Sequence, residues 1–248
     1  MNNKWVIDIN SGYRCCNGYK TIVGILKDEL FLDNPNSVLG ERYEQMISSV
    51  NCSYNNWGKC AQFDLRGTKD TLLVIPTCCF GGLQNCQSYH DLGHDLPYWI
   101  EVPKEKGRIM LVSQDPLRNN QDSGVITFSS PFGMHSMDYR GNRIMTQMVK
   151  MLLANGYSVY LTDFNKLYGK NQNKPVDFSG MRKQFTRILM EEIDFWNPTK
   201  IIAVGKVAGN ALNAVTINTG TKTGTIPHPN ARLSKVKKLS ELKNAAGL

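Results

Sequence analysis

The sequence predicts an α/β fold in which helices cover both faces of a parallel sheet. From Arg108 onward, short apolar segments typical of buried strands alternate with longer segments that have helical spacing. This repeated strand–helix order is typical of a parallel sheet. Gly156 marks the end of one helix, and Asn197 with Pro198 marks the end of another.

Each expected element has its own range. Strands are expected at 108–113, 157–162, 200–204 and 223–227. Helices are expected at 137–154, 178–195, 206–214 and 233–246. Earlier in the chain, the apolar spacing predicts a helix over 37–56 and a short buried strand over 71–75.

Charge divides the chain near residue 100. Residues 1–100 contain eight Lys or Arg against ten Asp or Glu, whereas residues 101–248 contain twenty-one against eleven. A chain of 248 residues can bury a full core, so we expect N-terminal elements over 1–100 packed on a core domain over 101–248. The basic excess favours a polyanion such as DNA, through phosphate contacts. A basic surface that only keeps the protein soluble is the alternative.

No stretch approaches the ~20 apolar residues of a membrane span, and the first residues do not resemble a signal peptide. We therefore expect a cytoplasmic protein with no membrane partner. All seven cysteines precede residue 87, and in a reducing compartment we expect thiols rather than disulfides. A zinc site from Cys79, Cys86, His90 and His94 is conceivable, but this spacing matches no common zinc pattern. Buried free thiols and no metal are the expectation.

Two apolar segments each end in a loop with one titratable group. Residues 108–116 are Arg-Ile-Met-Leu-Val-Ser-Gln-Asp-Pro and end with Asp115, while residues 224–230 are Gly-Thr-Ile-Pro-His-Pro-Asn and contain His228. Loops at the carboxyl ends of parallel strands line a shared crevice, so both groups are expected to face one substrate. This pair suits cleavage of a glycosidic bond, because the carboxylate stabilises a cation-like sugar and the imidazole hydrogen-bonds a departing base.

Four motifs in order resemble those of the uracil-DNA glycosylase superfamily. Residues 114–129 resemble its water-activating GQDPYH motif and the Gly-x-x-Phe-Ser stretch that follows, and residues 224–230 resemble its HPS loop. Residues 159–166, VYLTDFNK, resemble its base-reading strand VYITNVVK, and residues 201–208 resemble the strand and turn before its next helix. The resemblance covers roughly residues 107–240. It implies a three-layer α/β/α fold with a central four-stranded parallel sheet, here with additional N-terminal elements.

The resemblance implies catalytic and base-binding roles. Asp115 would position the attacking water and favour the oxocarbenium-like sugar, and His228 would hydrogen-bond O2 of the leaving pyrimidine. Gln114 would aim its backbone at the base, and Phe128 would stack on it. No cofactor is implied. Without the resemblance, an Asp before Pro is most often a turn cap and a loop His a solvated side chain.

DNA contacts are expected around these groups. Arg118 would hold a phosphate, and Lys206 opens a helix whose amides suit another phosphate. Asn230 lies in the loop that follows His228, and Arg232 or Leu233 would fill the gap that a flipped nucleotide leaves. The chain has Pro-Asn-Ala-Arg where the superfamily often has Pro-Ser-Pro.

Two departures from the uracil pattern suggest another base. Leu117 stands where the superfamily often has a Tyr whose ring blocks substituents on pyrimidine C5. The smaller Leu side chain relaxes this steric exclusion. Asp163 replaces the base-reading Asn, and an ionised Asp only accepts hydrogen bonds, which suits the amino group of cytosine. If this acceptor faced the carbonyl O4 of uracil, both oxygens would lack a donor, at a cost of roughly 1–3 kcal/mol in binding free energy. These differences favour a 5-substituted cytosine.

The expected activity is therefore that of a monofunctional DNA glycosylase acting on double-stranded DNA with a modified base, with no obligate protein partner. Superfamily members that remove glucosylated hydroxymethylcytosine from phage DNA as antiviral defence are known, and this chain resembles a candidate for that group. An ordinary uracil-DNA glycosylase of base excision repair is the alternative, and it requires either a protonated Asp163 or a different residue at the base-reading position. A DNA-binding module without catalysis is the alternative from another class.

Overall fold

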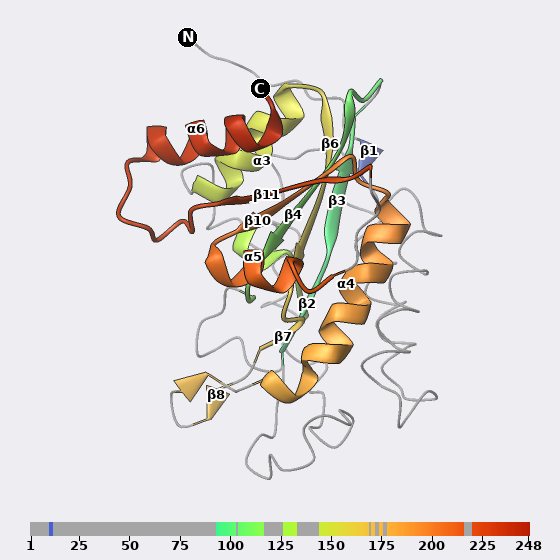
Figure 1. Ribbon diagram of the computed structural model, residues 1–248, viewed down its shortest axis with the longest axis vertical. Helices are drawn as coiled ribbons and strands as arrows, with labels where there is room; N and C mark the ends of the chain where they lie inside the picture. Colours follow the sequence, from blue (N-terminus) through green and yellow to red (C-terminus); the bar gives the residue numbers. More distant parts are fainter. Residues whose placement is uncertain are drawn as a thin grey trace.

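The computed structural model describes residues 10–11, 93–102, 104–116, 126–132, 144–168, 170–171, 174–175, 178–215 and 220–248. Within these ranges the largest sheet has six strands in the order β1-β3-β6-β4-β10-β11 (Figure 1). Their bounds are β1 Asn10–Ser11, β3 Tyr98–Glu101, β4 Gly107–Ser113, β6 Tyr157–Asp163, β10 Lys200–Val204 and β11 Lys222–Ile226. The protein is therefore of the α/β class.

The sheet is mixed rather than wholly parallel. Strands β6, β4, β10 and β11 are parallel to one another, as expected for these four strands. Strand β3 pairs antiparallel with β6, and β1 pairs antiparallel with β3. The prediction of a purely parallel sheet is corrected, because residues just before the repeated strand–helix region add an antiparallel edge.

The expected domain boundary at residue 100 falls within β3. Tyr98, Trp99 and Ile100 are buried in the same core as the parallel strands, and the Trp99 ring stacks on Tyr160 of β6 at 5.7 Å. Residues 93–101 are thus part of the main structure. The helix expected over 37–56 and the strand expected over 71–75 lie outside the described residues.

Four α-helices accompany the sheet in the described residues: α3 Ile144–Ala154, α4 Arg182–Trp196, α5 Lys206–Leu212 and α6 Lys235–Ala246. Helix α3 packs on β6 and on α6, α6 packs on β11, and α5 packs on β10. Helix α4 contacts β4 and lies on the side of the sheet away from α3 and α6 (Figure 1). Two smaller sheets join β5 Ile126–Phe128, β2 Gly93–Leu96 and β7 Leu167–Tyr168, and β8 Lys170–Asn171 with β9 Lys174–Pro175.

The observed helix ends have local physical causes. Helix α4 starts at Arg182 rather than at residue 178 because a 3-10 turn, Ser179–Met181, precedes it. Helix α6 starts at Lys235 because the Ser234 hydroxyl caps it by accepting a hydrogen bond from the backbone N–H of Lys237 at 3.2 Å. Helix α5 stops at residue 212, where a turn follows. The described part of the helix expected over 137–154 is α3, and residues 133–143 are not described.

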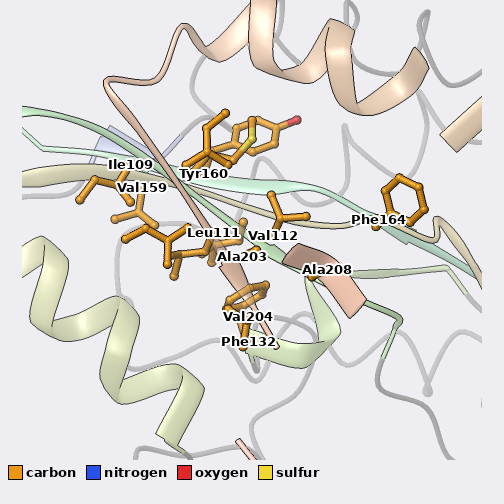
Figure 2. Packing of buried hydrophobic residues seen from close by; sticks show 14 of the residues in the cluster. Ile109, Leu111, Val112, Phe132, Val159, Tyr160, Phe164, Ala203, Val204 and Ala208 are labelled. Carbon is orange, nitrogen blue, oxygen red and sulfur yellow. The ribbon is translucent and has the colours of Figure 1, made fainter. Parts of the chain in front are cut away.

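Strands β4, β6 and β10 are buried along nearly their whole length, as expected when both faces of a sheet are covered. The last five residues of β4 and the last six of β6 are buried. Figure 2 shows side chains from these strands, among them Ile109, Leu111 and Val159, gathered in one core. This rigid sheet fixes the positions of the loops that leave its strand ends.

The described residues contain neither a candidate membrane span nor a candidate metal cluster. No helix there is both long enough and apolar enough to cross a bilayer. No group of three or more His, Cys, Asp or Glu side chains there could hold a metal ion. Cys79, Cys86 and His90 of the conceivable zinc site lie outside the described residues.

Candidate active site

Three loops with chemically useful residues leave the same edge of the sheet. Strand β4 is followed by Asp115, β10 by Gly205, and β11 by His228. These strands are parallel and adjacent in the order β4-β10-β11, so their carboxyl ends lie side by side. The topology therefore brings residues more than a hundred positions apart to one edge.

Asp115 and His228 line one cavity of about 530 Å³. Its described lining residues are Ser113, Gln114, Asp115, Pro116, Pro131, Ile144, Met145, Val204, His228, Pro229 and Asn230. Val204 is the last residue of β10, the strand that separates the two loops in the sheet. The volume lies within the range of 300–1,000 Å³ typical of small-molecule pockets. The cavity thus has an acid on one loop and an imidazole on the other.

The Asp115 carboxylate is held by hydrogen bonds from polar neighbours. The side-chain amide of Asn165 donates to its Oδ1, and the Gln114 side chain is also hydrogen-bonded to it. The walls of the cavity desolvate the carboxyl and raise its pKa above the ordinary value, while the two hydrogen bonds and the charge of His228 act in the opposite direction. The carboxyl of Asp115 therefore faces the cavity with Asn165 and Gln114 as its hydrogen-bond partners.

The loop that holds Asp115 is tied to the loop after β6. The backbone N–H of Phe164 donates to the Ser113 carbonyl at 2.9 Å, and that of Asn165 donates to the Gln114 carbonyl at 3.0 Å. These bonds continue the pairing of β4 with β6 beyond the last register pair, Ser113 with Asp163. The backbone around Asp115 is therefore part of the sheet framework.

The environment of His228 selects one tautomer. The backbone N–H of Asn230 donates to the imidazole Nδ1 at 3.1 Å. A ring nitrogen that accepts a hydrogen bond has no proton, so a neutral imidazole in this arrangement has its proton on Nε2. The ring can therefore offer an N–H donor at Nε2, which is the function expected for contact with a leaving base.

Gly205 leaves room for His228. Its φ of +93° is a conformation that favours glycine, and a Cβ there would lie 3.3 Å from both Cβ and Cδ2 of His228. The Gly205 N–H also donates to the carbonyl of Ile226 at 2.8 Å, which joins the turn after β10 to the end of β11. A side chain at this position would press on the imidazole.

Further hydrogen bonds hold the loop that contains His228. The Lys238 ammonium of α6 donates to the Pro229 carbonyl, and the backbone N–H of Ala231 donates to the His228 carbonyl at 2.8 Å. Lys238 is buried. Lys238 was not among the predicted site residues, although it lies on the same face of α6 as Leu242 at helical spacing.

The structure changes the interpretation of Asp163. This residue is only 2 % exposed, and the described residues that line the cavity do not include it. Burial raises its pKa well above the ordinary value, and the nearby carboxyl of Asp95 raises it further. The sequence led us to expect an ionised acceptor at this position, whereas burial and the neighbouring carboxyl both disfavour the charged form of Asp163. Its Oδ1 is hydrogen-bonded to the Ser113 hydroxyl, and Ser113 is the member of this group that lines the cavity.

A buried ion pair lies directly after β6. Lys166 and Glu192 are both fully buried, and the Lys166 ammonium contacts the two Glu192 oxygens at 2.8 and 2.7 Å. The Thr162 hydroxyl donates to Glu192 as well, at 3.0 Å, and accepts from Lys166. Burial raises the pKa of Glu192, while Lys166 opposes that shift. The signal in the sequence was a Glu on the apolar face of α4, four residues after Ile188.

The other predicted site residues have varied positions. Gln114 and Asn230 line the cavity, and Lys206 is exposed at the first turn of α5, next to Gly205. Arg232 is exposed and Leu233 is half-buried in the segment between His228 and α6. Leu117, Arg118 and the side chain of Phe128, for which roles were also predicted, lie outside the described part of the structure. Phe128 ends β5, and Pro131 of the turn that follows lines the cavity.

Comparisons with known proteins add no assignment: no family model matches this chain, and no curated protein matches it. The resemblance to the uracil-DNA glycosylase superfamily therefore rests on the four motifs.

Proposed function

We propose that this protein is a DNA glycosylase that hydrolyses the N-glycosidic bond of an extruded pyrimidine nucleotide and leaves an abasic site. One observation supports this proposal above all others. Asp115 and His228, which are 113 positions apart in the sequence, line the same cavity at the carboxyl edge of the sheet. The proposal includes the three-layer architecture of the uracil-DNA glycosylase superfamily, and the four central parallel strands with helices packed against them are consistent with it.

Hydrolysis would use the two groups in different ways. The bond between C1′ and the base nitrogen breaks, and its electron pair leaves with the base. Asp115, as a carboxylate, favours the positive charge on the sugar and orients the water whose oxygen bonds to C1′. The Nε2–H of His228 hydrogen-bonds O2 of the base as negative charge develops there. The proton lost from water passes to Asp115, and the released base takes up a proton from solvent.

DNA is the proposed partner because positive charge lies close to the cavity. Lys206 follows Gly205, which contacts His228, and Arg232, Lys235 and Lys237 lie exposed in the segment after His228. Phosphate contacts of this kind make binding strongly salt-dependent. We therefore expect affinity for duplex DNA to fall steeply as the salt concentration rises.

The base that we propose is a 5-substituted cytosine, such as glucosylated hydroxymethylcytosine of phage DNA. Support comes from Leu117, which is smaller than the Tyr that excludes C5 substituents in the uracil pattern. Uracil is the second candidate. The raised pKa of Asp163 disfavours its charged form, and this weakens the argument that an ionised acceptor selects the amino group of cytosine.

Base release distinguishes these proposals directly. The protein is incubated with duplexes that contain uracil, cytosine or glucosylated hydroxymethylcytosine, and free bases are measured by mass spectrometry. We expect release of a modified or deaminated pyrimidine, alkali-labile sites in the DNA, and no release of ordinary cytosine. Asp115→Asn should lower the rate by about a thousandfold or more while DNA binding is kept.

Asp194→Asn is the matched control, because Asp194 is an exposed aspartate on α4. It should leave the rate unchanged. If the wild-type protein binds these duplexes in a salt-dependent manner but releases no base from any of them, the protein is a DNA-binding module and the glycosylase proposal fails.

A further inference from the structure

Asn165 contacts the proposed catalytic carboxylate, although nothing in the motif comparison gives this residue a role. Its side-chain amide donates a hydrogen bond to Oδ1 of Asp115 across the junction between the β4 and β6 loops. The strand pattern that the chain resembles, VYITNVVK, has an apolar Val at the equivalent position. This contact is therefore a feature of the present chain rather than of the pattern.

The backbone on both sides of Asn165 is held firmly. Its own N–H donates to the Gln114 carbonyl at 3.0 Å, and that of Phe164 donates to the Ser113 carbonyl at 2.9 Å. The next residue, Lys166, is fully buried in its ion pair with Glu192, and its carbonyl accepts from the Asp95 N–H at 3.1 Å. An amide mounted on such a framework loses little additional conformational freedom when it makes its hydrogen bond.

We propose that Asn165 is a positioning residue for Asp115, whose side-chain amide fixes the orientation of the carboxylate toward the cavity. This inference rests on the proposed function and adds a residue to it. Asn165 is not among the described lining residues of the cavity, so it acts through Asp115 and not by contact with the substrate.

An amide suits this role for chemical reasons. It donates a hydrogen bond without titrating, so it holds the carboxylate over the whole working range of pH. A carboxylate at the same position would repel Asp115, and an apolar side chain would leave Oδ1 without this partner. The other groups that act on Asp115 are Gln114 and His228, and both also favour its ionised form, while burial opposes it.

The test uses Asn165→Ala and Asn165→Asp, with Asp115 followed by NMR of its carboxyl carbon as pH is varied. We expect the titration midpoint of Asp115 to move to higher pH in Asn165→Ala and further in Asn165→Asp, because a hydrogen bond to the ionised form is lost and then replaced by repulsion. In base-release assays kcat should fall about 10-fold to 100-fold, with a smaller change in KM. The acidic limb of the kcat profile should move with the NMR midpoint.

Two further variants separate positioning from a general effect on folding. Asn155→Ala removes a comparable amide hydrogen bond, from Asn155 Nδ2 to the Met151 carbonyl at 2.8 Å, and should change neither the midpoint nor kcat. Asn165→Gln keeps an amide donor and should recover part of kcat and part of the midpoint shift. Circular dichroism checks that each variant is folded.

The outcomes of the two proposals are distinguishable. The NMR titration requires no activity, so an unshifted Asp115 midpoint in folded Asn165→Ala overturns the positioning role whether or not a base is released. If the wild-type protein releases no base, the glycosylase proposal fails while the contact can still be verified by NMR. If the wild type is active and Asn165→Ala matches it in kcat and in pH profile, only the present inference fails.

Discussion

Two pairs of polar residues, Lys166 with Glu192 and Asp115 with His228, differ in their exposure and in their partners. Lys166 and Glu192 are fully buried, and their charged atoms contact each other and Thr162. Asp115 and His228 are exposed at a cavity, and only part of their hydrogen-bonding capacity is used by the protein. The first group has partners supplied by the fold, whereas the second is able to bind a substrate.

The partners of a charged residue near a site therefore indicate whether its role is structural or chemical. A buried charge that is paired and hydrogen-bonded holds elements together, here β6 with α4, and losing one partner leaves the other uncompensated. A charged group at a cavity whose hydrogen-bonding atoms are only partly used by the protein can act on a bound substrate. Mutations should therefore separate the two groups by their effects on stability and on activity.

The largest expected effect follows Lys166→Met. Glu192 would remain buried without its cation, and we expect a loss of about 3–5 kcal/mol in the free energy of unfolding. Urea unfolding followed by circular dichroism measures it. The double variant with Glu192→Leu should recover much of the loss, because no buried charge remains; a double variant as unstable as the single one would contradict this account.

Replacing His228 should change activity and leave stability nearly unaltered. His228→Ala removes the Nε2–H donor at an exposed position, and we expect kcat for base release to fall about 100-fold, with the urea midpoint unchanged. His228→Gln retains an N–H donor and should recover some of the rate. Equal kcat for wild type and His228→Ala would exclude the imidazole from the reaction.

Gly205→Ala should lower both the activity and the stability of the protein moderately. The positive φ strains any side chain, at a cost of about 1–2 kcal/mol, and the new Cβ would crowd the His228 ring. We expect a kcat reduced by about tenfold together with this loss of stability. Gly220→Ala is the control, because a Cβ there meets nothing within 4 Å and no positive φ is involved. Equal effects of the two substitutions would show that His228 is not crowded.

The smallest expected effect is a dependence of stability on pH. The folded-state pKa of Asp115 is raised by burial, so its ionisation opposes folding. Relative to Asp115→Asn, the wild type should be less stable above the folded pKa and should gain stability as pH falls through that pKa toward the unfolded value. Unfolding midpoints of both proteins across acidic pH measure the difference. A wild type that loses stability relative to the variant over this interval would contradict the sign.

Much of the fold was predictable because strands buried on both faces have a strong apolar signal. The four central strands agree with their predicted ranges to within one residue at either end, and their parallel order is confirmed. The antiparallel strand β3 was not predicted, since Tyr98–Glu101 is short and precedes the region of regular alternation. A four-residue strand has too few positions to show a period, and only its pairing with β6 defines it.

The site was predictable in part. The strand-end rule predicted that Asp115 and His228 would face a common crevice, and the cavity that both residues line agrees with that expectation. The contact of Asn165 with Asp115 and the room that Gly205 leaves for His228 were not visible, because each depends on distances between separate loops. The environment of Asp163 was not visible for the same reason, since its raised pKa depends on burial and on Asp95 from another strand.

The sequence by itself determined the order of strands and helices and the residue types available at each strand end. These are local properties, because periodicity and loop chemistry depend on neighbours in the chain. Only the tertiary structure decided which charges are buried and paired, as for Lys166 and Glu192, and which face a cavity, as for Asp115 and His228. Solvation and hydrogen bonding act over a few ångströms in space, and distant segments reach that range only when the chain is folded.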